Sequence, residues 1–110
     1  GVIFDLPNFA REGEINPALA VSVLRDYIDC LHVGGSRRVI AGNDALGFKQ
    51  LGKPMCRLTE SDLHVPTWLR TVRDAGLSPP LIVEDYTAEV PGERRLRQTV
   101  ADLRAALDAV

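Results

Sequence analysis

Three short apolar runs with helical patterns between them constrain the fold of this chain more than any other feature. The runs cover residues 2–4, 28–33 and 81–83; the last two are rich in β-branched residues and bounded by turn formers. Strands that alternate with helices are typical of a parallel sheet whose connections are right-handed crossovers. The sequence therefore predicts an α/β fold.

Three segments follow a helical period. The first begins at Asn16, an N-cap candidate before Pro17, and continues for about ten residues. The second covers about residues 65–76 and ends at Gly76, which suits a left-handed C-cap, and the third extends from about residue 91 to the end. The apolar faces expected for them are Leu19, Val23, Leu24 and Tyr27; Val65, Trp68, Leu69 and Val72; and Leu96, Val100, Leu103, Leu107 and Val110.

Composition narrows the class of protein and of partner. A chain of 110 residues, 45% hydrophobic and 25% charged, has room for one globular core. A net charge of -2 disfavours nucleic acid and anionic lipid as partners. Two cysteines, no apolar run near 18 residues and no signal-peptide start predict a cytoplasmic protein outside the membrane.

Residues 34–60 form an unusually long glycine-rich connection, with no strand or helix expected in it. Loops of this length in compact domains tend to be functional or disordered. Residues 34–38, Gly-Gly-Ser-Arg-Arg, could bind an anion through backbone N–H groups and two guanidinium groups. The alternative is a flexible, solvated loop that is glycine-rich by chance.

Each apolar run ends in a residue able to bind a metal or move a proton: Asp5, His32 or Glu84. Alternation along parallel strands would bring the three side chains to one face at the carboxyl edge of the sheet, where α/β folds place active sites. Two carboxylates and one imidazole suit Mn²⁺, Mg²⁺, Co²⁺ or Zn²⁺. Polar residues also mark strand ends simply because the chain surfaces there, and the pattern alone does not separate the two interpretations.

These residues resemble the last three units of the sugar phosphate isomerases and epimerases with a xylose isomerase-like (β/α)8 TIM barrel. In that family, strand six ends in Asp-x-x-His, strand seven in His-x-Lys-Asp and strand eight in a Glu. Here residues 5–8 read Asp-Leu-Pro-Asn, 32–35 read His-Val-Gly-Gly and 81–86 read Leu-Ile-Val-Glu-Asp-Tyr. The helix, Ala-Gly turn and proline before residue 81 also look like the family's entry to strand eight. The resemblance covers nearly the whole chain.

The resemblance implies a function and a site. Asp5, His32 and Glu84 would be three of four ligands of a divalent metal, with the fourth, a Glu, upstream of this sequence. The substrate would be a sugar or sugar phosphate, whose proton next to a carbonyl moves through a metal-stabilised enediolate, with Glu84 also the catalytic acid/base. Arg38, six residues after the His, corresponds to a common substrate contact.

Two departures from the family pattern bear on the substrate site. Asn8 replaces the commoner His; it can hydrogen-bond to substrate but cannot act as an imidazole base. Gly34 and Gly35, which are also expected to contact substrate, replace the Lys-Asp pair, and this removes charged groups from the pocket. An alternative function is therefore a non-catalytic module, derived from the same barrel, that binds a sugar or a partner chain.

The length of the chain, 110 residues, leads to a further prediction. A complete barrel of this type needs about 250 residues. Residues 1–110 are then one partial domain that lacks the upstream barrel, is inactive alone, and exposes strand edges and apolar surface that favour self-association. A free-standing three-stranded α/β domain is the other reading of the same pattern.

The remaining candidate residues are expected to be structural. His64 opens a helix and is expected to cap it or lie in solvent, and Trp68 is expected to anchor the core. Cys30 is expected to fill core space, while Cys56 has no His neighbour in sequence to make it a nucleophile.

Overall fold

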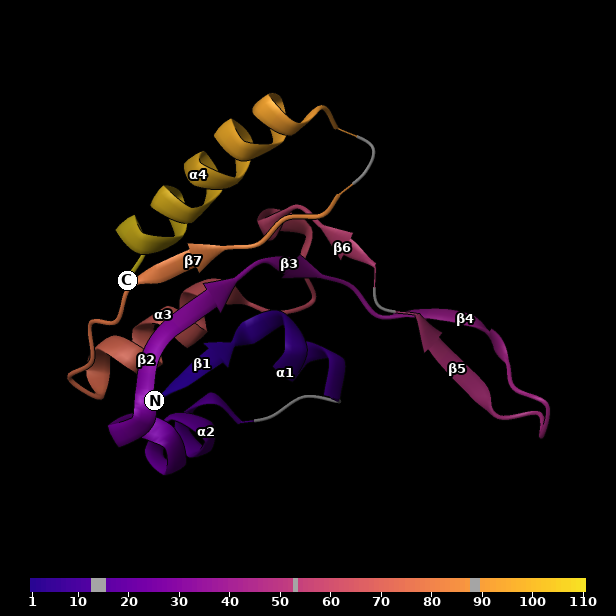
Figure 1. Cartoon of the computed structure of the whole chain (residues 1–110), viewed down its shortest axis with the longest axis horizontal. Helices are drawn as coiled ribbons and strands as arrows, with labels where there is room; N and C mark the ends of the chain where they lie inside the picture. Colours follow the sequence, from indigo (N-terminus) through magenta and orange to yellow (C-terminus); the bar gives the residue numbers. More distant parts are fainter. Residues whose placement is uncertain (13–15, 53, 88–89) are drawn as a thin grey trace.

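The computed structural model describes residues 1–12, 16–52, 54–87 and 90–110 and has a mixed α/β fold (Figure 1). Its elements are β1 (Val2–Asp5), α1 (Leu6–Glu12), α2 (Pro17–Leu24), η1 (Arg25–Tyr27), β2 (Ile28–Val33), β3 (Gly35–Ser36), β4 (Val39–Asn43), β5 (Lys49–Gly52), β6 (Met55–Cys56), η2 (Leu58–Glu60), α3 (Val65–Asp74), β7 (Leu81–Val83) and α4 (Gly92–Asp108). Strands β1, β2 and β7 form one sheet in that order, with both pairs parallel. The predicted α/β class and its three strands are confirmed.

The predicted helix ends are confirmed where a local signal marks them. The Oδ1 of Asn16 accepts hydrogen bonds from the N–H groups of Ala18 and Leu19, which caps α2. Gly76 has a φ of 76°, and the next N–H, of Leu77, donates back to the carbonyl of Val72 at the end of α3.

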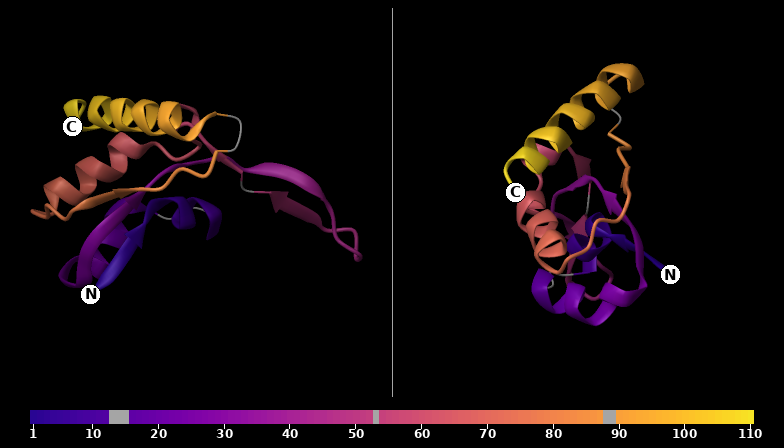
Figure 2. Two further views of the ribbon diagram at one scale, coloured as in Figure 1. Left: turned by 45° about the horizontal axis from the view of Figure 1, so that its top comes forward. Right: turned by 90° about the vertical axis from the view of Figure 1, so that its left-hand side faces the viewer.

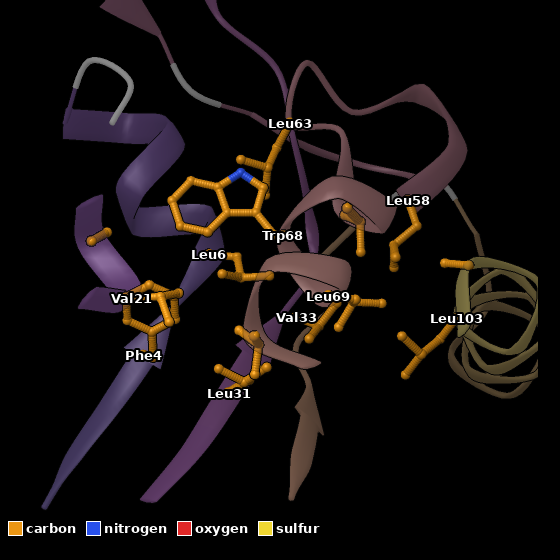
Figure 3. Close-up of a cluster of buried hydrophobic side chains, with 14 residues drawn as sticks. Phe4, Leu6, Val21, Leu31, Val33, Leu58, Leu63, Trp68, Leu69 and Leu103 are labelled. Carbon is orange, nitrogen blue, oxygen red and sulfur yellow. The ribbon is translucent and has the colours of Figure 1, made fainter. Parts of the chain in front are cut away.

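One face of the three-stranded sheet is buried under helices. Phe4, Leu31 and Val33 are at most 1% exposed and pack against α3, as Figure 3 shows. Trp68 of α3 lies in this core, as predicted, with ring-centroid distances of 5.7 Å to Phe4 and 5.5 Å to Phe9. Helix α4 packs on α3 and η2 and lies on the same side of the sheet as α3 (Figure 2).

The opposite face of the sheet is more open. Ile3 is 55% and Ile82 is 44% exposed. Cys30 alternates with the buried Leu31 and is half-buried on this open face, outside the core cluster. Its predicted place in the core is therefore wrong.

The apolar face predicted for the first helix is right only at Leu24, which is partly buried against the core. In α2 the buried side chains are Ala20 and Val21, whereas Leu19 and Val23 are more than 60% exposed, as is Tyr27 in η1. The sequence Pro-Ala-Leu-Ala-Val-Ser-Val-Leu is apolar on nearly every side, so its periodicity does not define which side meets the core.

In α4 the predicted face is right at Leu103 and wrong at Leu96 and Leu107, which are exposed. Two polar residues are buried there instead. Thr99 donates a hydrogen bond to Asp85, and Asp102 accepts two from Arg57, at 2.9 and 2.8 Å. The buried face of α4 therefore includes polar residues that pair with distant segments, and hydrophobic periodicity does not reveal such a face.

The predicted long loop of residues 34–60 contains strands instead. β4 and β5 form an antiparallel hairpin that projects from the body (Figure 1), and β3 pairs with β6. The Oδ1 of Asp44 accepts from the N–H groups of Leu46 and Phe48, and Gly47 has a φ of 86°, which closes the hairpin turn. Helix α1, directly after β1, was not predicted either.

Candidate metal centre

The parallel sheet brings together the three side chains predicted to bind a metal. Asp5 ends β1 and pairs in register with His32 of β2, while Glu84 directly follows β7, the strand on the other side of β2. One ligand atom from each residue lies within 4.8 Å of the others. The convergence expected from strand alternation is therefore present.

His32 lies at the centre of this cluster. Its Nδ1 atom is 3.1 Å from Oε1 of Glu84 and 3.6 Å from Oδ2 of Asp5. The side chain is only 15% exposed, and its Nδ1 atom is buried and forms no hydrogen bond of acceptable geometry. A buried polar atom without a partner is costly unless a proton shared with the carboxylates or a cation compensates it.

The three residues fit a divalent metal. An imidazole nitrogen and two carboxylate oxygens are ligands used by Mn²⁺, Co²⁺ and Zn²⁺, and the oxygens also suit Mg²⁺. The unpartnered Nδ1 is the atom that such an ion would take from His32. The cluster is therefore chemically suited to the predicted ion.

Asp5 is held in place by the helix that follows it. Its Oδ1 accepts a hydrogen bond of 2.8 Å from the backbone N–H of Asn8, in the first turn of α1. This leaves Oδ2 directed to His32. Asn8, predicted to contact substrate, thus has its N–H engaged with Asp5, and its side chain is exposed.

Glu84 is held through its backbone. Its N–H donates a hydrogen bond of 3.0 Å to the carbonyl of Val33, which extends the pairing of β2 with β7 by one residue. A Cβ atom on Gly34 would lie 2.5 Å from the Glu84 carbonyl oxygen. Gly34, predicted as a substrate contact, is therefore needed for the close approach of the two strand ends, a role that spacing alone did not show.

Asp85 is a residue of this region that the sequence analysis missed. Its Oδ2 accepts a hydrogen bond of 2.6 Å from Thr99 of α4, and its Oδ1 accepts one from the N–H of Thr87. Burial raises the pKa of Asp85, but the hydrogen bonds from Thr87 and Thr99 and the charge of Arg95 outweigh it and hold the pKa below its usual value. Asp85 therefore ties the end of β7 to α4. Its partner Thr99 is 14 residues away, so no local signal reveals it.

The predicted anion cradle of residues 34–38 does not form from backbone groups. The N–H groups of Ser36, Arg37 and Arg38 donate to Ser61 Oγ, the Pro54 carbonyl and Asp62 Oδ2. Gly35 is buried, and a Cβ there would lie 2.2 Å from the carbonyl oxygen of Cys56. Arg38, the last residue of this segment, is exposed.

His64 is exposed at the start of α3, as predicted, with Nδ1 2.7 Å from Oγ1 of Thr67. It takes no part in the metal cluster.

Comparisons with known proteins add no family assignment. No protein-family model matches the sequence, and a search of curated proteins finds no relative. Among the described residues, no helix is both long and apolar enough to cross a membrane.

Proposed function

We propose that the chain supplies Asp5, His32 and Glu84 to the divalent-metal site of a sugar or sugar phosphate isomerase or epimerase. In this proposal, the parallel strands β1, β2 and β7 correspond to the last three strands of a xylose isomerase-like (β/α)8 barrel. The observation that carries it is the buried Nδ1 of His32, which has no hydrogen bond and lies between two carboxylates at the carboxyl edge of the sheet.

Each residue has a separate task in this proposal. A bound divalent ion would act as a Lewis acid that polarises a carbonyl oxygen. Asp5 is oriented for the ion by its hydrogen bond to α1. Glu84 is 29% exposed, so a carboxylate oxygen can face a substrate and take the proton from the carbon beside the carbonyl.

Replacing Glu84 with Gln tests the proton transfer. The amide keeps the shape of the side chain but cannot accept the proton, so we expect proton transfer to fall by at least about 10²-fold. The readout, measured on the longer protein that supplies the rest of the proposed barrel, is deuterium uptake from D₂O into a panel of ketoses, aldoses and their phosphates in the presence of Mn²⁺. Glu93→Gln is the matched control, because Glu93 is 81% exposed on α4 and contacts Arg97 instead. Deuterium uptake that is equal in both variants would contradict the role of Glu84.

The second candidate is a binding module without catalysis. It is favoured by Gly34 and Gly35, which leave no side chain where the similar enzymes carry a charged pair, and which the close backbone packing requires as glycines. This function predicts sugar or metal binding, measured by calorimetry, with no deuterium exchange in any sugar of the panel.

A further inference from the structure

A second cleft, apart from the metal cluster, is rich in arginine. It has a volume of about 560 Å³ and is lined by residues of the connection into β4, of β6, of the segment after β7 and of the first half of α4. Arg37 lies in the connection into β4, Arg57 directly follows β6, and Arg94 lies in α4. Residues of β6 and of the start of α4 thus line the same cleft.

Arg57 is held rigidly at one side of the cleft. Its Nε and Nη2 atoms donate to the two carboxylate oxygens of Asp102, which is only 8% exposed. The amide oxygen of Gln98, in its hydrogen-bonding orientation, also accepts from the guanidinium group. The Arg57 side chain is still 41% exposed, so its charge is fixed in position and open to the cleft.

The other two arginines give the described residues of the lining an excess of positive charge. Arg37 pairs with Glu60 at 3.3 Å and remains 48% exposed. Arg94 is exposed and has no ion-pair partner among the residues that the structure describes. Among the described residues that line the cleft, the charged groups are three guanidinium groups and the carboxylate of Glu60, while Asp102 pairs with Arg57 from outside the lining.

Cys56 adds no negative charge to this balance. Burial, as the largest of several causes, raises the pKa of the Cys56 thiol above its usual value, so it stays protonated at neutral pH. The described lining therefore combines guanidinium groups with one carboxylate, a neutral thiol, an amide, a hydroxyl and apolar side chains.

We infer that this cleft binds the phosphate group of a phosphorylated small molecule. Guanidinium groups match phosphate oxygens in geometry and charge, and a site with one arginine already fixed loses less side-chain entropy on binding. The volume exceeds that of one phosphate group, so the rest of an ester fits beside it. This inference goes beyond the proposed isomerase and does not depend on the metal cluster.

The test is the binding of inorganic phosphate and of glycerol phosphate to the protein, measured by calorimetry in EDTA so that no metal ion contributes. We expect saturable binding of both. Arg94→Ala should weaken it at least tenfold, and Arg94→Lys should weaken it less, because the charge remains. The matched control is Arg104→Ala, because Arg104 is an exposed arginine of α4 that lies outside the cleft. This variant should leave the phosphate affinity unchanged.

Three outcomes would overturn the inference: no saturable binding at millimolar phosphate, equal affinity of Arg94→Ala and the unchanged protein, or equal weakening by Arg104→Ala. His32→Ala separates this test from that of the proposed function. It should abolish metal binding and leave phosphate affinity intact, so either property can fail while the other holds.

Discussion

The two faces of the β1–β2–β7 sheet have opposite characters although the same strands form both. On one face Phe4, Leu31 and Val33 are almost completely buried under helices. On the other, Ile3 and Ile82 are about half exposed, and the polar cluster of Asp5, His32 and Glu84 lies at the carboxyl end. Because side chains alternate along a strand, stability and chemistry can be changed separately by substituting adjacent residues.

The largest effect is expected on the covered face. In the chain of 110 residues, Leu31→Ala should lower the free energy of unfolding by about 2–5 kcal/mol, because a fully buried side chain is replaced by a cavity. Ile3→Ala should cost less than about 1 kcal/mol, since that side chain is already 55% exposed. Denaturation by urea measures both.

This pair of substitutions also checks whether the second face is open in solution. If Ile3→Ala costs as much as Leu31→Ala, a second layer covers the face and the comparison fails. Sedimentation of the same samples shows whether another copy of the chain supplies that layer.

A smaller effect is expected from metal on the polar cluster. Mn²⁺ or Zn²⁺ at a hundred times the dissociation constant should stabilise the protein by about 2.7 kcal/mol, because the ion binds only the folded cluster. Removing the ion with EDTA should reverse the gain. His32→Ala should abolish it, whereas His64→Ala should not, since His64 is exposed at the start of α3. The readout is the shift in melting temperature, and equal shifts in the two variants would contradict the cluster as the binding site.

Local signals in the sequence were sufficient for the three parallel strands β1, β2 and β7 and for the cluster. The apolar runs defined β2 and β7 to the residue, and alternation along parallel strands predicted that Asp5, His32 and Glu84 converge. This worked because strand direction and period alone determine where the three side chains lie.

Features that depend on contacts between distant segments were not predictable. The buried face of α4 is determined by Arg57 and Asp85, which bind Asp102 and Thr99 from segments far along the chain. The hairpin of β4 and β5 is a local pairing that was missed for another reason, because its residues give no clear apolar alternation. The role of Gly34 becomes clear only when Glu84 lies against it.

The smallest effect is expected at two adjacent residues whose side chains contact different parts of the molecule. Glu84 faces the polar cluster, whereas Asp85 is hydrogen-bonded to Thr99 of α4. Asp85→Asn should therefore lower the stability by about 1 kcal/mol at neutral pH, since hydrogen bonds to a buried charge are lost. Glu84→Gln should lower the stability less than Asp85→Asn, because Glu84 lacks such a link to α4.

The pH dependence of that loss identifies its cause. The pKa of Asp85 is lower in the folded protein than in the unfolded chain, so its ionised form stabilises the fold at pH values above the unfolded pKa of about 3.9. This stabilisation is lost as the pH falls through the lowered pKa. The difference in melting temperature between Asp85→Asn and the unchanged protein should therefore be full at pH 7 and shrink below about pH 4. The control is Asp108→Asn, which removes an exposed carboxylate at the end of α4. The melting-temperature difference for this variant should show no such trend. A difference that stays constant down to pH 2 would mean that Asp85 acts by packing and not by charge, and that β7 is joined to α4 without an electrostatic contribution.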